Sequence, residues 1–396
     1  MRRFAVCTVV AALLFASSLA AQSSEFGIRG LGIPGRELSA RGLSLGGSIG
    51  IFDGESSLNP AALATLTTAT ALFTSEGGWR SSTNPAGSMS TRDTRFPQIL
   101  IGGPIPHQRI SLGFSYSMYT DRDFTVVSDG SASPRGVPIA VHDTLTSLGG
   151  IDDLRLGAGW AVNPHLAVGA ALHLLAGSNR LASRRFWDDT TYQSPQDVAE
   201  LSYTATGFSV GLIWQPIPRV EVAAAFRHDG TLTIQRDSTG NGQVLFPTST
   251  VGHVPMPNTL SGALRVTPSR RLALSGSFST RNWAVTDSSL EAQGAPGARS
   301  TYEVNGGVEF FRDVRRPLKY PLRLGARYTT LPFLLVPGTQ PKEYGFSIGT
   351  GRRFAQERGG FDISVEHVWR SQGTGYQESA TLITFGISVR PGGLTP

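Results

Sequence analysis

Hydrophobic residues alternate with polar or small residues along most of this chain. Apolar side chains take every second position from Ile110 to Met118, and residues 219–235, 321–331 and 360–370 keep the same period. A period of two predicts β-strands with one apolar face. Each run is close to the roughly ten residues that a tilted membrane strand needs. Fourteen strands are predicted, at 67–75, 95–102, 109–120, 153–162, 165–177, 200–214, 219–235, 258–267, 271–284, 300–312, 321–331, 343–354, 360–370 and 379–390.

The connections between these strands alternate between short and long. Short ones include Asn163-Pro164 and Gln215 to Pro218, whereas long ones include 121–152, 178–199 and 236–257. Short periplasmic turns and long outer loops, joined to an even number of strands, are typical of bacterial outer-membrane barrels. The sequence therefore predicts an all-β fold, an antiparallel transmembrane β-barrel of about 14 strands over residues 67–390.

The first residues predict export. Arg2 and Arg3 precede an apolar core and small residues up to Ala21, which is the pattern of a signal peptide over residues 1–21. Cys7, the single cysteine, lies in this segment, so no disulfide is expected in the mature chain. No later stretch approaches the roughly 18 continuous apolar residues of a membrane helix, and a closed barrel remains possible.

Charge and aromatic residues agree with a barrel that has a polar interior. Charged residues make up 16% of the chain, and the formal net charge of +6 is spread along it, so no basic patch for nucleic acid is predicted. Aromatic belts at both membrane interfaces are expected from strand-end residues. These are Trp160, Trp214 and Phe354 at short turns and Tyr119, Trp283 and Trp369 at long loops. The predicted inward set is Arg155, Glu221, Arg227, Arg265, Glu303, Glu309, Arg323, Arg327 and Glu366.

A glycine-rich stretch, residues 40–63, precedes the strands. Asn59 followed by Pro60 predicts a short helix from Pro60 to about Leu66, because Asn caps free N–H groups and proline suits the first helical position. Residues 22–66 are predicted to form a hatch in the lumen. Its key residues are Gly46, Gly47, Asp53, Asn59, Pro60 and Ala61.

Gly-Gly, an acidic pair and Asn-Pro-Ala in this stretch resemble the hatch of the FadL-type superfamily, outer-membrane transporters of long-chain fatty acids and other hydrophobic compounds. Its start, Ala-Arg-Gly-Leu-Ser-Leu-Gly-Gly, also resembles the related barrels that shuttle cargo in type IX secretion. Ala62 stands where these families usually have Gly, and Gly54 splits the acidic pair. The resemblance covers about 25 residues. It implies passive uptake of a hydrophobic ligand, fatty-acid-like or aromatic, through an apolar pocket above the hatch.

The alternation reverses once, within residues 200–214. Apolar residues hold odd positions up to Ala205 and even positions from Phe208. Because a shift of one residue turns every side chain to the other face, a bulge or kink is predicted at Thr206 and Gly207. It is either a relief of curvature or an opening in the wall.

Two outer loops offer candidate ligand contacts. Residues 184–187 join guanidinium groups to aromatic rings, which suits a carboxylate head with an apolar tail or the phosphates of lipopolysaccharide. The apolar run 331–337 and residues 246–256 are expected to form the walls of a groove. The candidate residues are Arg184, Arg185, Phe186, Trp187, Phe246, Met256, Phe333, Leu334 and Leu335.

Enzymatic chemistry is not predicted. No Gly-x-Ser-x-Gly elbow appears, and His173, His228 and His367 lie on different strands without a partner evident in sequence. No catalytic residue, metal or cofactor is expected. Three functions stay open: hydrophobic uptake, a secretion-associated barrel that binds protein partners through its outer loops, and a general porin, against which a hatch argues. Expected lipid partners are outer-membrane lipids and lipopolysaccharide.

Overall fold

The structure is a computed structural model that describes residues 24–391 except 86, 135, 241–242 and 292–296, with the side chains of 238–248 also left aside. The predicted signal peptide, Cys7 and the side chain of Phe246 lie outside the described residues. Among the described residues, no helix has the length and apolar character needed to cross a membrane.

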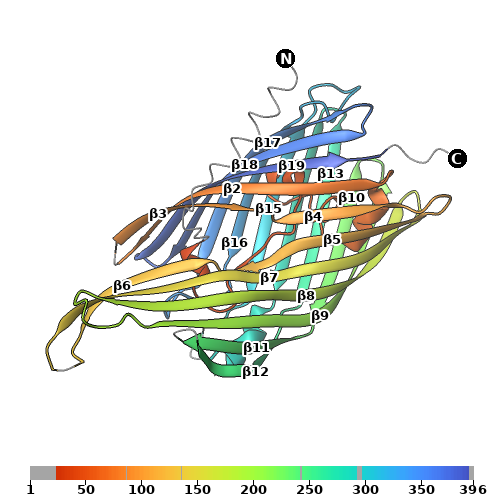
Figure 1. Cartoon of the computed structure of the whole chain (residues 1–396). Coiled ribbons are helices and arrows are strands. Elements are labelled where there is room, and N and C mark those ends of the chain that lie inside the picture. Colours follow the sequence, from red (N-terminus) through yellow and green to blue (C-terminus); the bar gives the residue numbers. More distant parts are fainter. Residues whose placement is uncertain (1–23, 86, 135, 241–242, 292–296, 392–396) are drawn as a thin grey trace, which may run out of the picture.

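Fourteen antiparallel strands close into a barrel, as predicted (Figure 1). The last strand pairs with the first over Gln377–Val389 and Ala71–Thr83, so the sheet closes on itself. The barrel strands are β2 (Thr70–Asn84), β4 (Gln98–Pro104), β5 (Ile110–Asp121), β7 (Ile139–Asn163), β8 (Leu166–Trp187), β9 (Gln196–Ile217), β10 (Val220–Asp229), β13 (Thr259–Ser269), β14 (Leu272–Arg281), β15 (Thr301–Phe310), β16 (Leu322–Thr330), β17 (Lys342–Phe354), β18 (Gly359–Gln372) and β19 (Tyr376–Val389).

Five further strands lie in the N-terminal region or extend the barrel beyond its outer end. They are β1 (Ile33–Pro34), β3 (Gly87–Arg95), β6 (Phe124–Ala132), β11 (Thr231–Gly240) and β12 (Gln243–Pro255). Together with the long outer halves of β7, β8 and β9, most of them make a sheet that projects from one side of the barrel (Figure 1). The short helices are η1 (Glu25–Gly27), α2 (Ala40–Ser44), η2 (Pro60–Thr65), η3 (Trp283–Thr286) and α3 (Asp287–Glu291).

Aromatic belts surround the barrel, but the outer belt differs from the prediction. Trp160, Trp214, Phe354 and Trp369 are exposed on the outer surface as expected. Tyr119 and Trp283 are buried, because Tyr119 faces the lumen and Trp283 lies in a loop folded over the mouth. Their places in the outer belt are taken by aromatic residues of neighbouring strands. These are Trp79, Tyr302, Tyr328 and Tyr344, which join Trp369 in this belt.

The predicted kink of β9 at Thr206 and Gly207 is wrong. The register between β8 and β9 is constant from Trp214 to Gln196, and odd residues of β9 face inward throughout. What changes at Gly207 is the surroundings: below it the outward residues are apolar and meet lipid, and above it they are polar. The reversal therefore marks where β9 leaves the membrane. A bulge lies on the partner strand instead, at Gly230, whose N–H donates to the Thr206 carbonyl at 2.8 Å.

Candidate functional site: a plugged lumen and a gap in its wall

Residues 24–66, called the lumenal segment below, run through the barrel from its outer end to its periplasmic end (Figure 1). At the outer end the Ser24 hydroxyl donates to Glu378 of β19 at 2.7 Å. At the periplasmic end η2 lies against β7, β8 and β9, where Gly159 and Gly169 leave room for its backbone. About eight strands already close down to a packed interior, so a wider barrel needs such a filling.

The predicted hatch residues all lie in this segment. Asn59 caps η2, since its Oδ1 accepts from the Ala61 N–H at 3.0 Å and its Nδ2 donates to the Ile51 carbonyl at 2.9 Å. Pro60 is the first residue of η2, so the expected helix is present, as a 3-10 helix. Asp53 accepts hydrogen bonds from Ser39 and Ser56, which ties the glycine-rich stretch to itself.

Gly46 and Gly47 form a left-handed turn, with φ of 69° and 99°. Such angles suit glycine because it has no Cβ. The Gly46 N–H donates to the Ser347 hydroxyl of β17 at 3.0 Å, and its backbone rests directly on Gly325 of β16. Two glycines, one on each side, therefore let the lumenal segment touch the wall.

Two consecutive residues of the lumenal segment bind strands far apart in the wall. Arg36 donates to Glu366 of β18 at 2.7 Å, and Glu37 accepts from Arg227 of β10 at 2.9 Å. Around the barrel wall, where β10 pairs with β13, the five strands β13 to β17 lie between β10 and β18, so these contacts span the lumen. Glu37 has a φ of 50°, which in a non-glycine residue costs on the order of 1–3 kcal/mol. The surrounding ion pairs hold it there.

Further ion pairs fix the deeper part of the segment. Arg41 donates to Glu309 at 3.0 Å, and Glu55 accepts from Arg353 at 3.2 Å and from Arg390. Removing one member of a buried pair leaves the other charge unpaired, which is costly. The lumenal segment is therefore held by charge as well as by packing, notably of Ile51 and the residues around it against small wall side chains.

The space left beside the lumenal segment is a cavity of about 160 Å³. It is not the apolar pocket that was expected, because charged wall residues such as Arg327 and Glu343 line it together with apolar residues such as Leu38. Most of these charges are paired with one another. Arg281 of β14 also lines the cavity, and among the described residues no carboxylate lies within ion-pair distance of it.

Outer loops close the mouth of the barrel above this cavity. Phe333 packs on Trp283 with ring centroids 5.4 Å apart, and Met256 belongs to the same buried cluster. Leu335 packs on Phe26 of the lumenal segment, and Leu334 lies against Gly297. The expected groove is therefore filled. The cluster, called the outer apolar cluster below, consists of Leu31, Tyr119, Ile151, Leu175, Tyr203, Ala205, Leu232, Ile234, Val254, Met256, Trp283, Leu290, Ala298 and Phe333.

The wall itself has a gap between β3 and β5. Strands β3 and β4 follow one another along β2 and both pair with it. Only the part from Pro97 to Pro104, nearer the periplasm, also hydrogen-bonds to β5. Above Pro97, β3 pairs with β2 alone. Two residues of β2 face three residues, 96–98, at this point, which is a bulge that turns β3 away. Trp79 of the outer belt pairs with Arg92 of β3, so the gap lies near the external interface between membrane and water.

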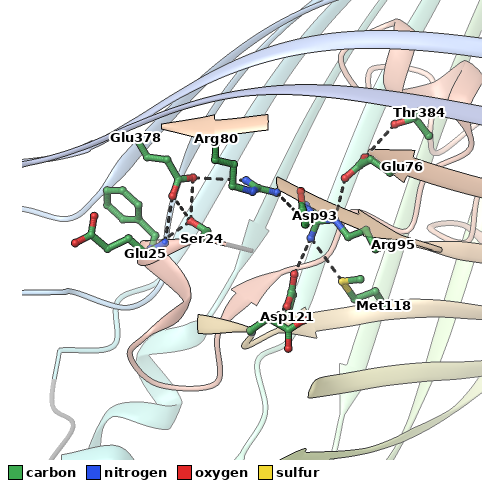
Figure 2. A network of polar contacts seen from close by, with 12 residues as sticks. Ser24, Glu25, Glu76, Arg80, Asp93, Arg95, Met118, Asp121, Glu378 and Thr384 are labelled. Carbon is green, nitrogen blue, oxygen red and sulfur yellow. Dashed lines mark hydrogen bonds and ion pairs between the residues drawn. The ribbon is translucent and has the colours of Figure 1, made fainter. Parts of the chain in front are cut away.

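Side chains bridge this gap where backbone bonds do not (Figure 2). Arg95 of β3 donates to Asp121 of β5 at 2.7 Å and to Glu76 of β2 at 3.0 Å. Asp93 and Arg80, paired at 3.1 Å, continue this network towards Glu378 and Ser24. The network thus connects the start of the lumenal segment with the edge of the gap.

Strand β1 of the lumenal segment fills the place that β3 leaves on β5. Ile33 pairs with Asp121 and Pro34 with Thr120, and the Gly35 N–H donates to the Tyr119 carbonyl at 2.8 Å. A Cβ at Gly35 would overlap the Met118 carbonyl oxygen, so only glycine allows this approach. The register of β5 against β7 shifts between Met118 and Thr120, so β5 is bulged at the same level.

A titratable group lies just above the gap, in the connection from β5 to β6. Burial raises the pKa of Asp123 to about 6, and the neighbouring Asp121 carboxylate adds to this rise. The Asp123 backbone N–H donates to Asp121 at 3.1 Å, so the two residues form one unit with Arg95.

Comparison with known proteins identifies the family of this chain. The model of the family described as BamG matches residues 1–375. The chain belongs to the BamG family. Solved structures share the fold of this BamG-family barrel. A FadL homologue of Pseudomonas aeruginosa has a TM-score of 0.63 at 12% identity, with 90% of this chain and 99% of that one covered.

Two hydrocarbon channels are also similar to the BamG-family barrel. The toluene transporter TodX of Pseudomonas putida has a TM-score of 0.58 at 11% identity, covering 91% of this chain and 99% of TodX. The monoaromatic hydrocarbon channel CymD has a TM-score of 0.55 at 14% identity, covering 89% and 97%. No curated protein matches the sequence. The FadL-type resemblance is thus confirmed for the fold, and the protein is an outer-membrane barrel.

Residues 184–187 of the BamG-family barrel do not join the outer apolar cluster. They end β8 in the projecting sheet, where Arg185 pairs with Asp143 at 2.6 Å and Arg184 lies over the Phe186 ring at 4.2 Å. Trp187 stacks on Tyr192. The guanidinium groups and aromatic rings of residues 184–187 therefore find their partners within the projecting sheet. They lie in a different region from Met256 and Phe333.

One constellation was missed in the sequence. His173 lies between Asp153 and Ser209, with Nδ1 at 2.8 Å from Asp153 Oδ2 and Nε2 at 2.8 Å from the Ser209 hydroxyl. The order is that of a nucleophilic triad, yet Arg227 also binds Asp153 at 2.9 Å and connects it to Glu37. These wall residues therefore support Arg227, which binds Glu37 of the lumenal segment. The sequence signal that could have found this group is that Asp153, His173 and Ser209 each occupy an inward position on the consecutive strands β7, β8 and β9.

Proposed function

We propose that this BamG-family barrel is a passive channel for small hydrophobic or amphipathic compounds, gated by the lumenal segment acting as a hatch. The observation that carries the proposal is the gap between β3 and β5, which is occupied by β1 of the lumenal segment instead of a wall strand. Two members of the outer apolar cluster, Leu31 and Tyr119, adjoin this place. The likeness to FadL and hydrocarbon channels supports the same function.

The route has three stages. A compound enters the outer apolar cluster, where burial of apolar surface favours binding at roughly 25 cal/mol per Å². β1 then leaves β5, giving up a few hydrogen bonds at a net cost of about 0.5–1.5 kcal/mol each. The compound passes between β3 and β5 into the outer leaflet. Passage straight down the lumen is disfavoured for apolar compounds, because the charged wall would have to lose its water.

Arg281 selects amphipathic compounds. Its guanidinium lines the cavity without a carboxylate partner among the described residues, and hydroxyls of Thr259 and Ser279 line the same side. A carboxylate head binds such a group by charge-assisted hydrogen bonds, and the apolar tail then extends towards Tyr119.

The experiment compares two probes in an outer membrane that lacks other channels of this type. We expect the protein to speed uptake of both radiolabelled oleate and toluene, and Arg281→Gln to lower oleate uptake about tenfold while toluene uptake is unchanged. Liposomes containing the protein should not swell in small sugars, whereas a variant lacking residues 22–58 should admit them. Unchanged uptake of both probes on adding the protein contradicts the proposal.

A second function, binding of a protein partner, is favoured by the projecting sheet. β3 hydrogen-bonds to β2 alone and β6 to β7 alone, so each presents a free edge outside the membrane. Free edges accept a strand from another chain. Copurification of a partner that is lost in Ser128→Pro, together with absent uptake of oleate and toluene, would favour this function over the channel.

A further inference from the structure

The periplasmic face of the barrel carries a concentration of positive charge that the linear sequence does not reveal. Along the chain the charge looks evenly spread, but three neighbouring turns, β13–β14, β15–β16 and β17–β18, gather basic residues at one side. Eight basic side chains are exposed there, whereas the same turns hold two acidic residues, the half-buried Asp313 and the exposed Glu357. The eight, called the basic turn patch below, are Arg270, Arg271, Arg312, Arg315, Arg316, Lys319, Arg352 and Arg358.

These charges lack internal partners, unlike those of the lumen. Arginines that face the lumen, such as Arg36, Arg41 and Arg95, each pair with a carboxylate. Within the described part of the chain, no guanidinium or amine nitrogen of the basic turn patch lies within 4 Å of a carboxylate oxygen, and Asp313 accepts only from the backbone N–H of Arg315, at 2.9 Å. Like charges crowded on one face repel one another, and a bound anion relieves that repulsion.

The patch has other features of a protein-binding surface. The β15–β16 turn, residues 311–321, is the longest on this side and supplies four of the eight cations. Tyr320 is exposed beside them, with Arg352 at 5.3 Å from its ring centroid and donating to its hydroxyl at 2.9 Å. Tyrosine and arginine are enriched at protein interfaces.

The distribution around the barrel separates a protein from lipid headgroups. Lipid surrounds the barrel evenly, so headgroup contacts would place cations on every turn. The turns β4–β5, β7–β8 and β9–β10 carry only Arg109 and Arg219 with two histidines. A one-sided patch matches a partner that approaches from one side.

We infer that the basic turn patch docks an acidic polypeptide segment, rich in Asp and Glu, of a periplasmic or periplasm-facing protein. Carboxylates of that segment pair with the arginines, and Tyr320 provides an aromatic contact within the charged surface. This inference is independent of the proposed channel, because it concerns the other end of the barrel.

Lysine chemistry allows a direct test. The chain has two lysines, Lys319 in the patch and Lys342 at the outer end. Carbodiimide joins a lysine amine to a carboxylate in contact with it, so cells treated with it should yield an adduct whose mass spectrum joins Lys319 to an Asp or Glu side chain of another polypeptide. Lys319→Arg, which keeps the charge, should abolish the adduct, and Lys342→Arg should leave it.

Charge reversal then tests whether the patch is the cause. We expect Arg312→Glu with Arg315→Glu and Arg316→Glu to lower the adduct yield about tenfold or more, while Arg109→Glu with Arg219→Glu changes it little. Uptake of oleate should be unaltered in both variants. Absence of a Lys319 adduct, equal loss in both charge variants, or binding of the purified protein to phosphatidylglycerol vesicles but not to a synthetic Glu-rich peptide would overturn the inference.

Discussion

Arg95 on β3 and Asp121 on β5 form an ion pair of 2.7 Å across a part of the barrel wall where these strands share no backbone hydrogen bond (Figure 2). Adjacent barrel strands normally satisfy each other's backbone groups, since lipid cannot. Here the β5 edge is satisfied by β1 of the lumenal segment. Wall and plug are therefore one structure at this point, and opening one releases the other.

Breaking the ion pair should favour the open gap. Arg95→Met leaves Asp121 without its cation, at a cost of about 1–3 kcal/mol, which shifts the closed–open equilibrium about 5- to 150-fold. Initial rates of oleate uptake should rise. Arg185→Met, which breaks a pair of 2.6 Å in the projecting sheet, is the matched control and should leave the rate unchanged. Equal rates of oleate uptake in the two variants would show that this ion pair does not control the opening of the gap.

Gly35→Ala should displace β1 without unfolding the barrel. The added Cβ overlaps the Met118 carbonyl oxygen, so the backbone must move off β5. Hydrogen exchange of the backbone amide at residue 35 should become faster, and oleate uptake should rise. Gly306→Ala, in a barrel strand where an added Cβ meets nothing within 4 Å, should match the natural protein in both measurements. Unchanged exchange in Gly35→Ala would mean that β1 tolerates the methyl group.

Asn59→Ala should loosen the lower part of the lumenal segment. The variant loses the η2 cap, worth about 0.5–2 kcal/mol, and the hydrogen bond to Ile51. We expect faster exchange in residues 59–66 with little change in the unfolding temperature of the barrel. Asn163→Ala, which removes a similar bond in an exposed turn, is the control. A large drop in barrel unfolding temperature for Asn59→Ala would assign the residue to the wall's stability instead.

The region around the gap should lose stability as pH rises. Burial raises the pKa of Asp123 from its usual 3.8 to about 6. The folded state therefore binds its proton more tightly than the unfolded state, and the stabilisation present below about pH 3.8 is lost as pH rises through about 6. The Gly149 N–H donates to the Asp123 carboxyl group, and its hydrogen exchange, corrected for the intrinsic pH dependence, should speed up over this interval. Asp123→Asn should remove the pH dependence.

The strands could be predicted from sequence because their signal is local. All fourteen barrel strands were expected, since alternation and turn length appear within each hairpin. The gap could not be predicted, because it depends on which distant strand pairs with β5. Pro97, which has no N–H and interrupts a strand pattern, was the local sign of it. The reversal at Gly207 was misread because leaving the membrane changes the polarity of both faces without any bulge in β9.

Site residues were harder to predict for the same reason. Met256 and Phe333 are far apart in sequence and meet because loops fold over the mouth, whereas residues 184–187 look similar in composition and end in another region. The basic turn patch combines residues from three turns, so an even distribution along the chain became a cluster in space. Arg281 lacks a carboxylate partner among the described residues, unlike inward arginines such as Arg227 and Arg327, and only the fold reveals this difference.

The most direct test of the account is a reversible lock of β1 on β5. Pro34 and Thr120 are directly opposed, and the Gly35–Tyr119 bond on one side makes theirs a non-hydrogen-bonded pair with Cα atoms about 4.5 Å apart, within the range of a disulfide. Pro34→Cys with Thr120→Cys should take up oleate and toluene when reduced, and not when oxidised, with uptake restored by reductant. Equal uptake in the oxidised and reduced states would contradict the account.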